Sequence, residues 1–80
     1  MDTISSVFKA THGVMTTEVG VISGDLELRT TSDKEGNLTL AITYVDADEW
    51  YTLPGGNYQL HDTRDHDVIH RMLIAVLNRQ

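Results

Sequence analysis

The stretch Leu38-Thr39-Leu40-Ala41-Ile42-Thr43-Tyr44 decides the fold, because its apolar and polar side chains alternate with a period of two. That period is typical of a half-buried β-strand, whose successive side chains point to opposite faces of a sheet. Alternating runs also occur at residues 4–11, 15–21 and 26–29. We therefore expect several consecutive strands before and including residues 38–44.

Turn residues separate these runs. Thr11-His12-Gly13 and Ser23-Gly24-Asp25 each predict a turn, since glycine adopts positive φ without steric cost. Residues 33–37 predict a polar loop. Further along, residues 50–53 have a strand-like composition, Leu53-Pro54-Gly55-Gly56 fits a type II turn, and residues 57–60 predict a short fifth strand.

A helix is expected last, over about residues 64–78. Asp62 or Thr63 can accept from the free amides at its start. At 100° per residue one broad apolar face forms, with Ile74 outside it. So wide a face suits either a helix sunk into the sheet or a homodimer contact. The apolar face comprises Val68, Ile69, Met72, Leu73, Val76 and Leu77, and the candidate dimer contact comprises His70, Leu73, Ile74 and Leu77.

These elements predict one small α+β domain over residues 1–80. A four- to five-stranded antiparallel sheet occupies about residues 3–60, and one C-terminal helix packs on it. The chain has no cysteine, so neither a disulfide nor a thiolate zinc site can support its small core.

Charge and hydropathy narrow the classes of partner. The net charge is −6, and the six basic residues are scattered singly along the chain. Direct binding to nucleic acid is therefore not expected, whereas a protein partner with a basic surface is favoured. The longest apolar run, residues 72–77, is too short to span a membrane, and since no apolar run follows the acidic start Met1-Asp2-Thr3, we expect no secretory signal. We expect a soluble, cytoplasmic protein.

The acidic, aromatic stretch Asp46, Asp48, Glu49, Trp50, Tyr51 is the strongest candidate for a partner-binding surface. Asp62, Asp65 and Asp67 would extend it if the start of the helix lies close to this loop. Carboxylates edged by aromatic rings can imitate nucleic acid or fit a basic groove. In the alternative interpretation, the charges are merely solvated and the two aromatic rings close one end of the core.

Two histidines, His66 and His70, stand four residues apart on the expected helix, a spacing that metal ligands use. Without a matching distant ligand set the pair is a weak metal candidate, and we expect no metal or other cofactor. The alternative places both rings half-buried at the shoulder of the apolar face.

No motif indicates catalysis. The chain has no G-x-S-x-G stretch and no cysteine nucleophile. Its hydroxyl groups fall mostly along the expected strands, where threonine is favoured for packing reasons. We therefore predict that the protein is not an enzyme.

In length, acidity and β-sheet-plus-helix layout, the chain resembles small inhibitors encoded by phages and other mobile elements, including anti-CRISPR proteins and other DNA mimics. The resemblance is one of general character and involves no shared motif. It implies a binding protein that blocks a nucleic-acid-binding surface on a larger protein. The alternatives are a self-associating accessory protein and, third, a metal-binding module using His66 and His70.

Overall fold

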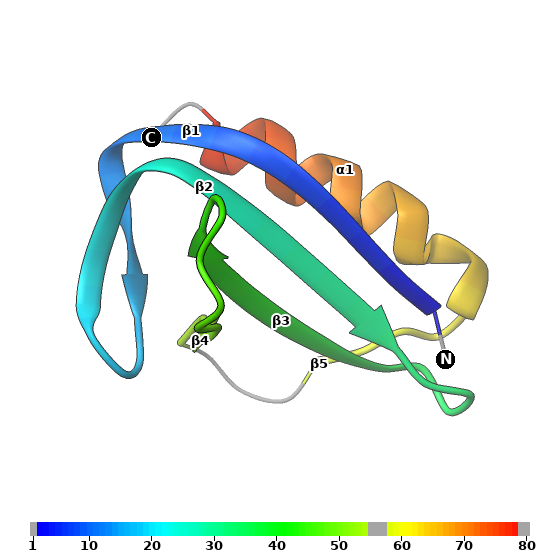
Figure 1. Cartoon of the computed structure of the whole chain (residues 1–80). Coiled ribbons are helices and arrows are strands. Elements are labelled where there is room, and N and C mark those ends of the chain that lie inside the picture. Colours follow the sequence, from blue (N-terminus) through cyan, green and yellow to red (C-terminus); the bar gives the residue numbers. More distant parts are fainter. Residues whose placement is uncertain (1, 55–57, 79–80) are drawn as a thin grey trace.

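A computed structural model describes residues 2–54 and 58–78, and Figure 1 shows a curved sheet with one helix lying along it. Among these residues, no helix is long and apolar enough to cross a membrane. The elements are β1 (Asp2–Thr16), β2 (Gly20–Ser32), β3 (Asn37–Tyr44), β4 (Tyr51–Thr52), β5 (Tyr58–Gln59), the 3₁₀ turn η1 (Thr63–Asp65) and α1 (His66–Leu77).

The sheet is antiparallel with strand order β1-β2-β3-β4, and β5 also pairs with β3. The predicted α+β class, with four to five strands followed by a C-terminal helix, is thereby confirmed. The helix lies against β1 and β2 (Figure 1). The predicted type II turn at residues 53–56 and the first residue of the strand predicted at 57–60 fall partly outside the described residues.

The two turns predicted in the first third of the chain are wrong. β1 and β2 form one long hairpin whose turn lies at residues 17–19, inside a stretch predicted to be a strand. Thr16 Oγ1 donates to the Gly20 carbonyl at 2.7 Å and accepts from Val19 N at 3.2 Å, so this side chain closes the turn.

The glycines at the predicted turns bend the hairpin instead of ending it. Gly13 and Gly24 have φ of 98° and 102°, and the register shifts between Ala10 and Val14. Such a bulge inserts unpaired residues and increases the local bend while pairing resumes beyond it. A Cβ at position 13 would collide with the Val21 side chain, so only glycine fits. The bend carries the hairpin turn around to β4 (Figure 1), where Thr17 N donates to the Thr52 carbonyl at 2.9 Å.

The core lies between the concave face of the bent sheet and α1. Burial of apolar side chains there supplies the main stabilising free energy. Its buried members are Phe8, Ala10, Val14, Ile22, Leu26, Leu28 and Ile42, with Tyr51, Leu53, Leu73, Ile74 and Leu77 packed against them and partly buried.

The helix meets the sheet through a face that coincides only in part with the predicted one, since Leu73 and Leu77 pack against the core as expected. His66 and His70 are only 3% and 2% exposed, so the expectation of half-buried rings at a shoulder is wrong. Val68, Met72 and Val76, predicted to lie within the packed apolar face, are 48%, 57% and 55% exposed. The side of the helix that carries His66 and His70 faces the sheet because hydroxyl groups on β1 and β2 form hydrogen bonds with the two rings.

Candidate functional site

The acidic loop, residues 45–50, joins β3 to β4 and has a well-defined backbone. Val45 N donates to the Asp25 carbonyl at 3.1 Å, and Ala47 N donates to the Tyr44 carbonyl at 3.0 Å. The Thr43 hydroxyl donates to the Glu49 carbonyl. Asp46 takes the left-handed conformation, with φ of 68°, which aspartate tolerates better than most residues. The backbone bonds therefore hold the loop in one shape.

The carboxylates of this loop point into solvent. Asp46, Asp48 and Glu49 are all exposed. Within residues 2–54 and 58–78, Asp46 and Asp48 form no ion pair, and Glu49 accepts only from the Tyr51 hydroxyl, at 3.1 Å. That hydrogen bond, with partial desolvation, raises the pKa of Tyr51. The loop therefore presents negative charge that no cation among the described residues neutralises in an ion pair.

Trp50, the last residue of the loop, and Tyr51, the first residue of β4, lie on different faces of the sheet. Tyr51 is in register with Ile42 and packs against the core. Trp50 stacks on Arg29, whose guanidinium carbon lies 4.0 Å from the ring centroid. Arg29 alternates with the buried Leu28 and Thr30, so Trp50 covers the outer face. The two aromatic residues predicted to act together therefore lie apart: Tyr51 packs against the core, whereas Trp50 is half-buried on the outer face.

The hairpin turn adds a further carboxylate to this end of the molecule. Glu18 accepts from Thr52 N at 2.7 Å and from Thr52 Oγ1 at 2.8 Å. These bonds, the one from the backbone first, lower the pKa of Glu18. We call the loop, the turn and the adjoining part of β2 the acidic end, which contains Glu18, Asp25, Glu27, Asp46, Asp48 and Glu49.

The acids at the start of the helix do not join the acidic end. His66 bonds to Ser32, which is in register with Leu38, whereas the loop follows Tyr44. Six residues of extended strand separate Leu38 from Tyr44, which corresponds to about 20 Å. The structure therefore does not bring Asp62, Asp65 and Asp67 together with the loop in one patch.

Two of these three acids are neutralised locally. Asp62 caps η1 by accepting from Arg64 N at 2.9 Å, and its carboxylate pairs with the Arg64 guanidinium at 2.7 Å. The side-chain bond from Arg64 is the main cause of the lowered pKa of Asp62. Asp67 pairs with Arg71 at 3.0 Å. These two carboxylates have arginine partners, whereas the carboxylates of the acidic loop form no ion pair within the described part of the chain.

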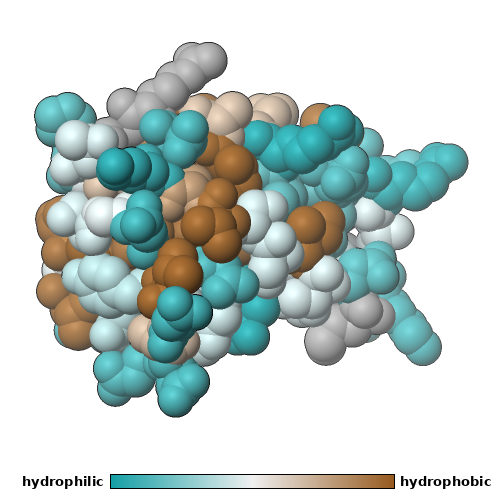
Figure 2. Space-filling model, turned by 45° about the horizontal axis from the view of Figure 1, so that its top comes forward, coloured by the Kyte–Doolittle hydropathy of each residue, from teal (hydrophilic) through white to brown (hydrophobic). Residues whose placement is uncertain are grey.

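The predicted dimer contact is also directed inwards. His70 is buried, and Leu73, Ile74 and Leu77 pack partly against the core cluster. The large apolar side chains that α1 leaves exposed are Val68, Met72 and Val76. Figure 2 shows apolar atoms reaching one face of the molecule between hydrophilic groups.

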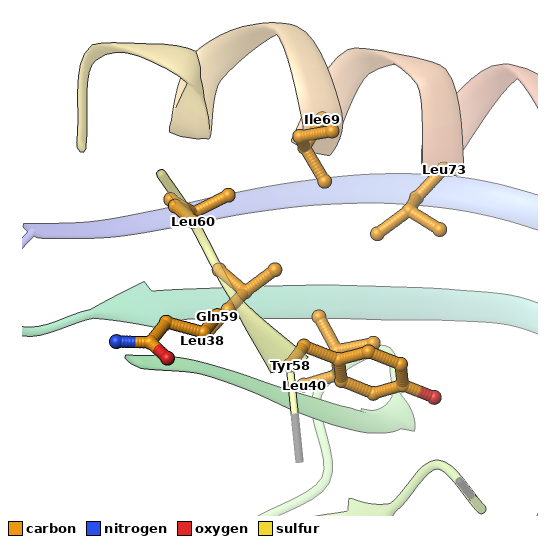
Figure 3. A pocket seen from close by; sticks show the side chains of 7 residues that line it. All are labelled: Leu38, Leu40, Tyr58, Gln59, Leu60, Ile69 and Leu73. Carbon is orange, nitrogen blue, oxygen red and sulfur yellow. The ribbon is translucent and has the colours of Figure 1, made fainter. Parts of the chain in front are cut away.

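An apolar cleft of about 440 Å³ opens between α1 and the edge of the sheet (Figure 3). Ile69 and Leu73 point into it from the helix, and Leu38 and Leu40 face them from β3 (Figure 3). Tyr58, Gln59 and Leu60 complete its lining. No prediction from sequence named this cleft, because its walls come from segments about thirty residues apart. Only the apolar alternation of residues 38 and 40 hinted at one wall.

The helix–sheet interface contains a series of hydrogen bonds that we call the hydroxyl–histidine chain. Ser6 Oγ lies 2.8 Å from His70 Nε2, and Thr30 Oγ1 lies 2.8 Å from His70 Nδ1. Thr30 Oγ1 also lies 2.7 Å from His66 Nε2, while Ser32 Oγ lies 2.9 Å from His66 Nδ1. All four ring nitrogens are therefore bonded to hydroxyl groups.

This arrangement leaves no ring nitrogen available to a metal. The described residues contain no group of three or more His, Cys, Asp or Glu placed to hold a metal ion. The predicted candidates His66 and His70 lie together, but each faces hydroxyl partners on β1 and β2.

The contact between Ser6 and His70 has the spacing of a nucleophile and its general base. The third member is the Thr30 hydroxyl, which has no charge to stabilise an imidazolium. Burial, and secondarily the neighbouring His66, lower the pKa of His70. The described chain thus contains a serine–histidine contact of this length but no carboxylate bonded to the other nitrogen of that histidine.

Comparisons with protein-family models, with curated proteins and with solved structures each found no match to this chain.

Proposed function

We propose that the protein is a small non-enzymatic binding module of the inhibitor type, which places its acidic end on a basic or nucleic-acid-binding surface of a larger cytoplasmic protein. The observation that carries the proposal is the contrast in pairing among its acids. Arginines neutralise Asp62 and Asp67, whereas Asp46 and Asp48 have no such partner among the described residues.

The bases near the acidic end add little positive charge to its surface. Arg29 is half-buried beneath Trp50, and Lys9 lies opposite Asp25 on β1. Six carboxylates therefore share this end with two cations, of which one is covered by an indole. The resulting negative electrostatic potential favours association with a cationic surface and disfavours association with nucleic acid itself.

The shape of the loop also supports binding. Hydrogen bonds to the backbone of residues 45, 47 and 49 order the loop before any partner arrives. A surface that is already ordered loses less conformational entropy on association. Trp50, held on Arg29 at the side of the loop, offers a large aromatic surface of the kind enriched at binding hot spots.

A charge-matched pair of variants tests the proposal. The loop variant carries Asp46→Asn, Asp48→Asn and Glu49→Gln, and the helix-start variant carries Asp62→Asn, Asp65→Asn and Asp67→Asn. Each removes three negative charges, so nonspecific electrostatic effects are equal. Circular dichroism first establishes that each variant is folded. We expect affinity capture from lysate of the source or host cells to retain a partner on wild type and on the helix-start variant, but not on the loop variant.

Salt dependence of the captured complex gives a second measurement. Since exposed charges are screened within about 10 Å at 0.1 M salt, the wild-type complex should weaken steeply as salt is added. Binding that is indifferent to salt, or that survives in the loop variant, contradicts the proposal.

Self-association is the second candidate, and the exposed apolar residues of α1 favour it. Val68 and Met72 lie four residues apart and are about half exposed, so they form a ridge on the outer side of the helix. Sedimentation velocity at micromolar concentration tests this candidate. A dimer that Met72→Glu dissociates supports it, and a monomer at every concentration removes it.

A further inference from the structure

Four of the five members of the hydroxyl–histidine chain are buried, and only Ser6 is part-buried. Thr30 and Ser32 are 0% and 1% exposed, and the two rings are almost equally covered. Among the described residues, no buried side-chain nitrogen or oxygen lacks a hydrogen-bond partner. Every buried polar atom of this chain of hydrogen bonds therefore has a partner, and the proton positions that satisfy all of them can be deduced.

Burial of Ser32 determines the direction of every bond. In the described structure the only side-chain partner of Ser32 Oγ is His66 Nδ1, so the Ser32 hydroxyl must donate to it. His66 then carries its proton on Nε2 and donates to Thr30 Oγ1. Thr30 in turn donates to His70 Nδ1, and His70 Nε2 donates to Ser6. Ser6 is only part-buried, so its own proton can point to water.

One extra proton breaks this order wherever it is placed. If His66 becomes doubly protonated, Nδ1 turns into a donor and the Ser32 hydroxyl loses its acceptor. If His70 becomes doubly protonated, the Thr30 hydroxyl must reverse and donate to His66 Nε2. The His66 proton then moves to Nδ1, and the Ser32 hydroxyl again has no acceptor. Both cases leave a buried donor unpaired and a charge in a poorly solvated interface, and each of these disfavours the docked state.

Among the described residues, no carboxylate is hydrogen-bonded to either ring, and the charge of Asp67, which raises the pKa of His70, has a smaller influence than burial and His66, which lower it. Around α1, the Asp67–Arg71 pair is exposed and Arg64 is held by Asp62, which leaves Asp65 exposed on η1. On β2 the charged residues Asp25, Glu27 and Arg29 alternate with the buried ones and face the other side of the sheet. β3 has no charged residue.

β1 offers one carboxylate on the helix-facing side. Asp2 is in register with Ser32, but it is exposed, and no hydrogen bond joins it to either ring. Lys9, the other charged residue of β1, lies at the opposite end of the helix, where its N–H donates to Asn78 Oδ1 at 3.0 Å. The histidines therefore face only hydroxyl groups.

We infer that the hydroxyl–histidine chain is a pH-sensitive latch: α1 docks on the sheet when both rings are neutral, and uptake of a proton by His66 or His70 releases it. Ile69 and Leu73 form the helix wall of the apolar cleft, so release also opens that cleft. The inference is independent of the proposed binding function, because it concerns another part of the molecule.

Hydrogen exchange of the α1 amides, followed by NMR on the full chain, tests the latch. In the opened state, a solvated histidine has a pKa near 6.5 and can take up a proton. Between pH 7 and pH 5, this uptake shifts the equilibrium towards the opened state by up to about 25-fold. We expect opening of α1 to increase by up to that factor through His70, after correction for intrinsic exchange. The amides of the β2–β3 pair should remain protected over the same range.

Two exposed histidines provide the controls. His12→Asn and His61→Asn should leave the pH dependence of α1 exchange unchanged, whereas His70→Asn should reduce it. If His70→Asn fails to fold, NMR titration of the wild-type imidazoles decides the matter. The latch is overturned if protection of α1 is the same at pH 7 and pH 5, or if His66 or His70 takes up a proton while the helix stays docked.

Discussion

The acidic loop at residues 45–50 and the start of the helix at residues 62–70 are both acidic, but their carboxylates differ in how they are paired. Each carries three acids. In the loop, hydrogen bonds hold the backbone and leave the carboxylates of Asp46 and Asp48 without ionic partners in the described structure. At the helix start, the side chains themselves make the bonds: Asp62 caps η1, Asp67 pairs with Arg71, and the histidines bind the sheet.

The difference shows that acidic residues alone do not identify a binding surface. Paired carboxylates stabilise a local structure, whereas unpaired carboxylates on an ordered backbone remain available to a partner. Substitutions at the helix start should therefore change stability, and substitutions in the loop should change binding with little effect on stability.

The largest effect is expected at Thr30, which bonds both histidines. Thr30→Val keeps the shape but leaves two ring nitrogens without a partner, which should lower the free energy of unfolding by about 2–4 kcal/mol. Urea denaturation measures the change. Thr31→Val, on the outer face of the same strand, is the matched control and should have a much smaller effect.

Acid should reduce stability in two separate stages. Burial lowers the pKa of His70 below its ordinary 6.5, so the folded state binds fewer protons and its advantage is lost as pH falls below 6.5. Hydrogen bonds lower the pKa of Glu18, Asp33 and Asp62, so their contributions persist until pH falls below about 4.5. Urea midpoints measured from pH 7.5 to 3 should show both stages. A single stage below pH 4.5 contradicts the role given to the histidines.

A smaller effect is expected from the backbone of the loop. Asp46 has φ of 68°, a conformation that costs an ordinary L-residue about 1–2 kcal/mol. Asp46→Ala should therefore destabilise the fold by about 1 kcal/mol, whereas Asp46→Gly should be neutral or stabilising. Thermal unfolding distinguishes the two, and equal destabilisation by both would show that the carboxylate matters to stability more than the backbone does.

The smallest effect on stability is expected where the effect on binding should be greatest. The loop variant Asp46→Asn, Asp48→Asn, Glu49→Gln should change the free energy of unfolding by no more than about 0.5 kcal/mol, as surface substitutions usually do. A larger loss would mean that these acids support the fold, and the contrast with the helix start would disappear.

Much of the architecture was predictable because it depends on local periodicity. The alternation at residues 38–44 correctly predicted β3, and the apolar spacing after residue 64 predicted α1. The turns around Gly13 and Gly24 were predicted wrongly, since positive φ serves a bulge as well as a turn and only the opposite strand distinguishes them. The functional role predicted for the loop stays a prediction.

The sequence by itself determined the α+β class, the excess of acid and the positions of the helix and the main strands, because these follow from residue type and spacing along the chain. Only the tertiary structure decided which acids are paired, which side of the helix is buried and where a cleft opens. His66 and His70 lie inside because Ser6, Thr30 and Ser32 offer them hydroxyl partners from strands more than thirty residues away. No local sequence pattern predicts these contacts, because they depend on which strands become neighbours in the folded protein.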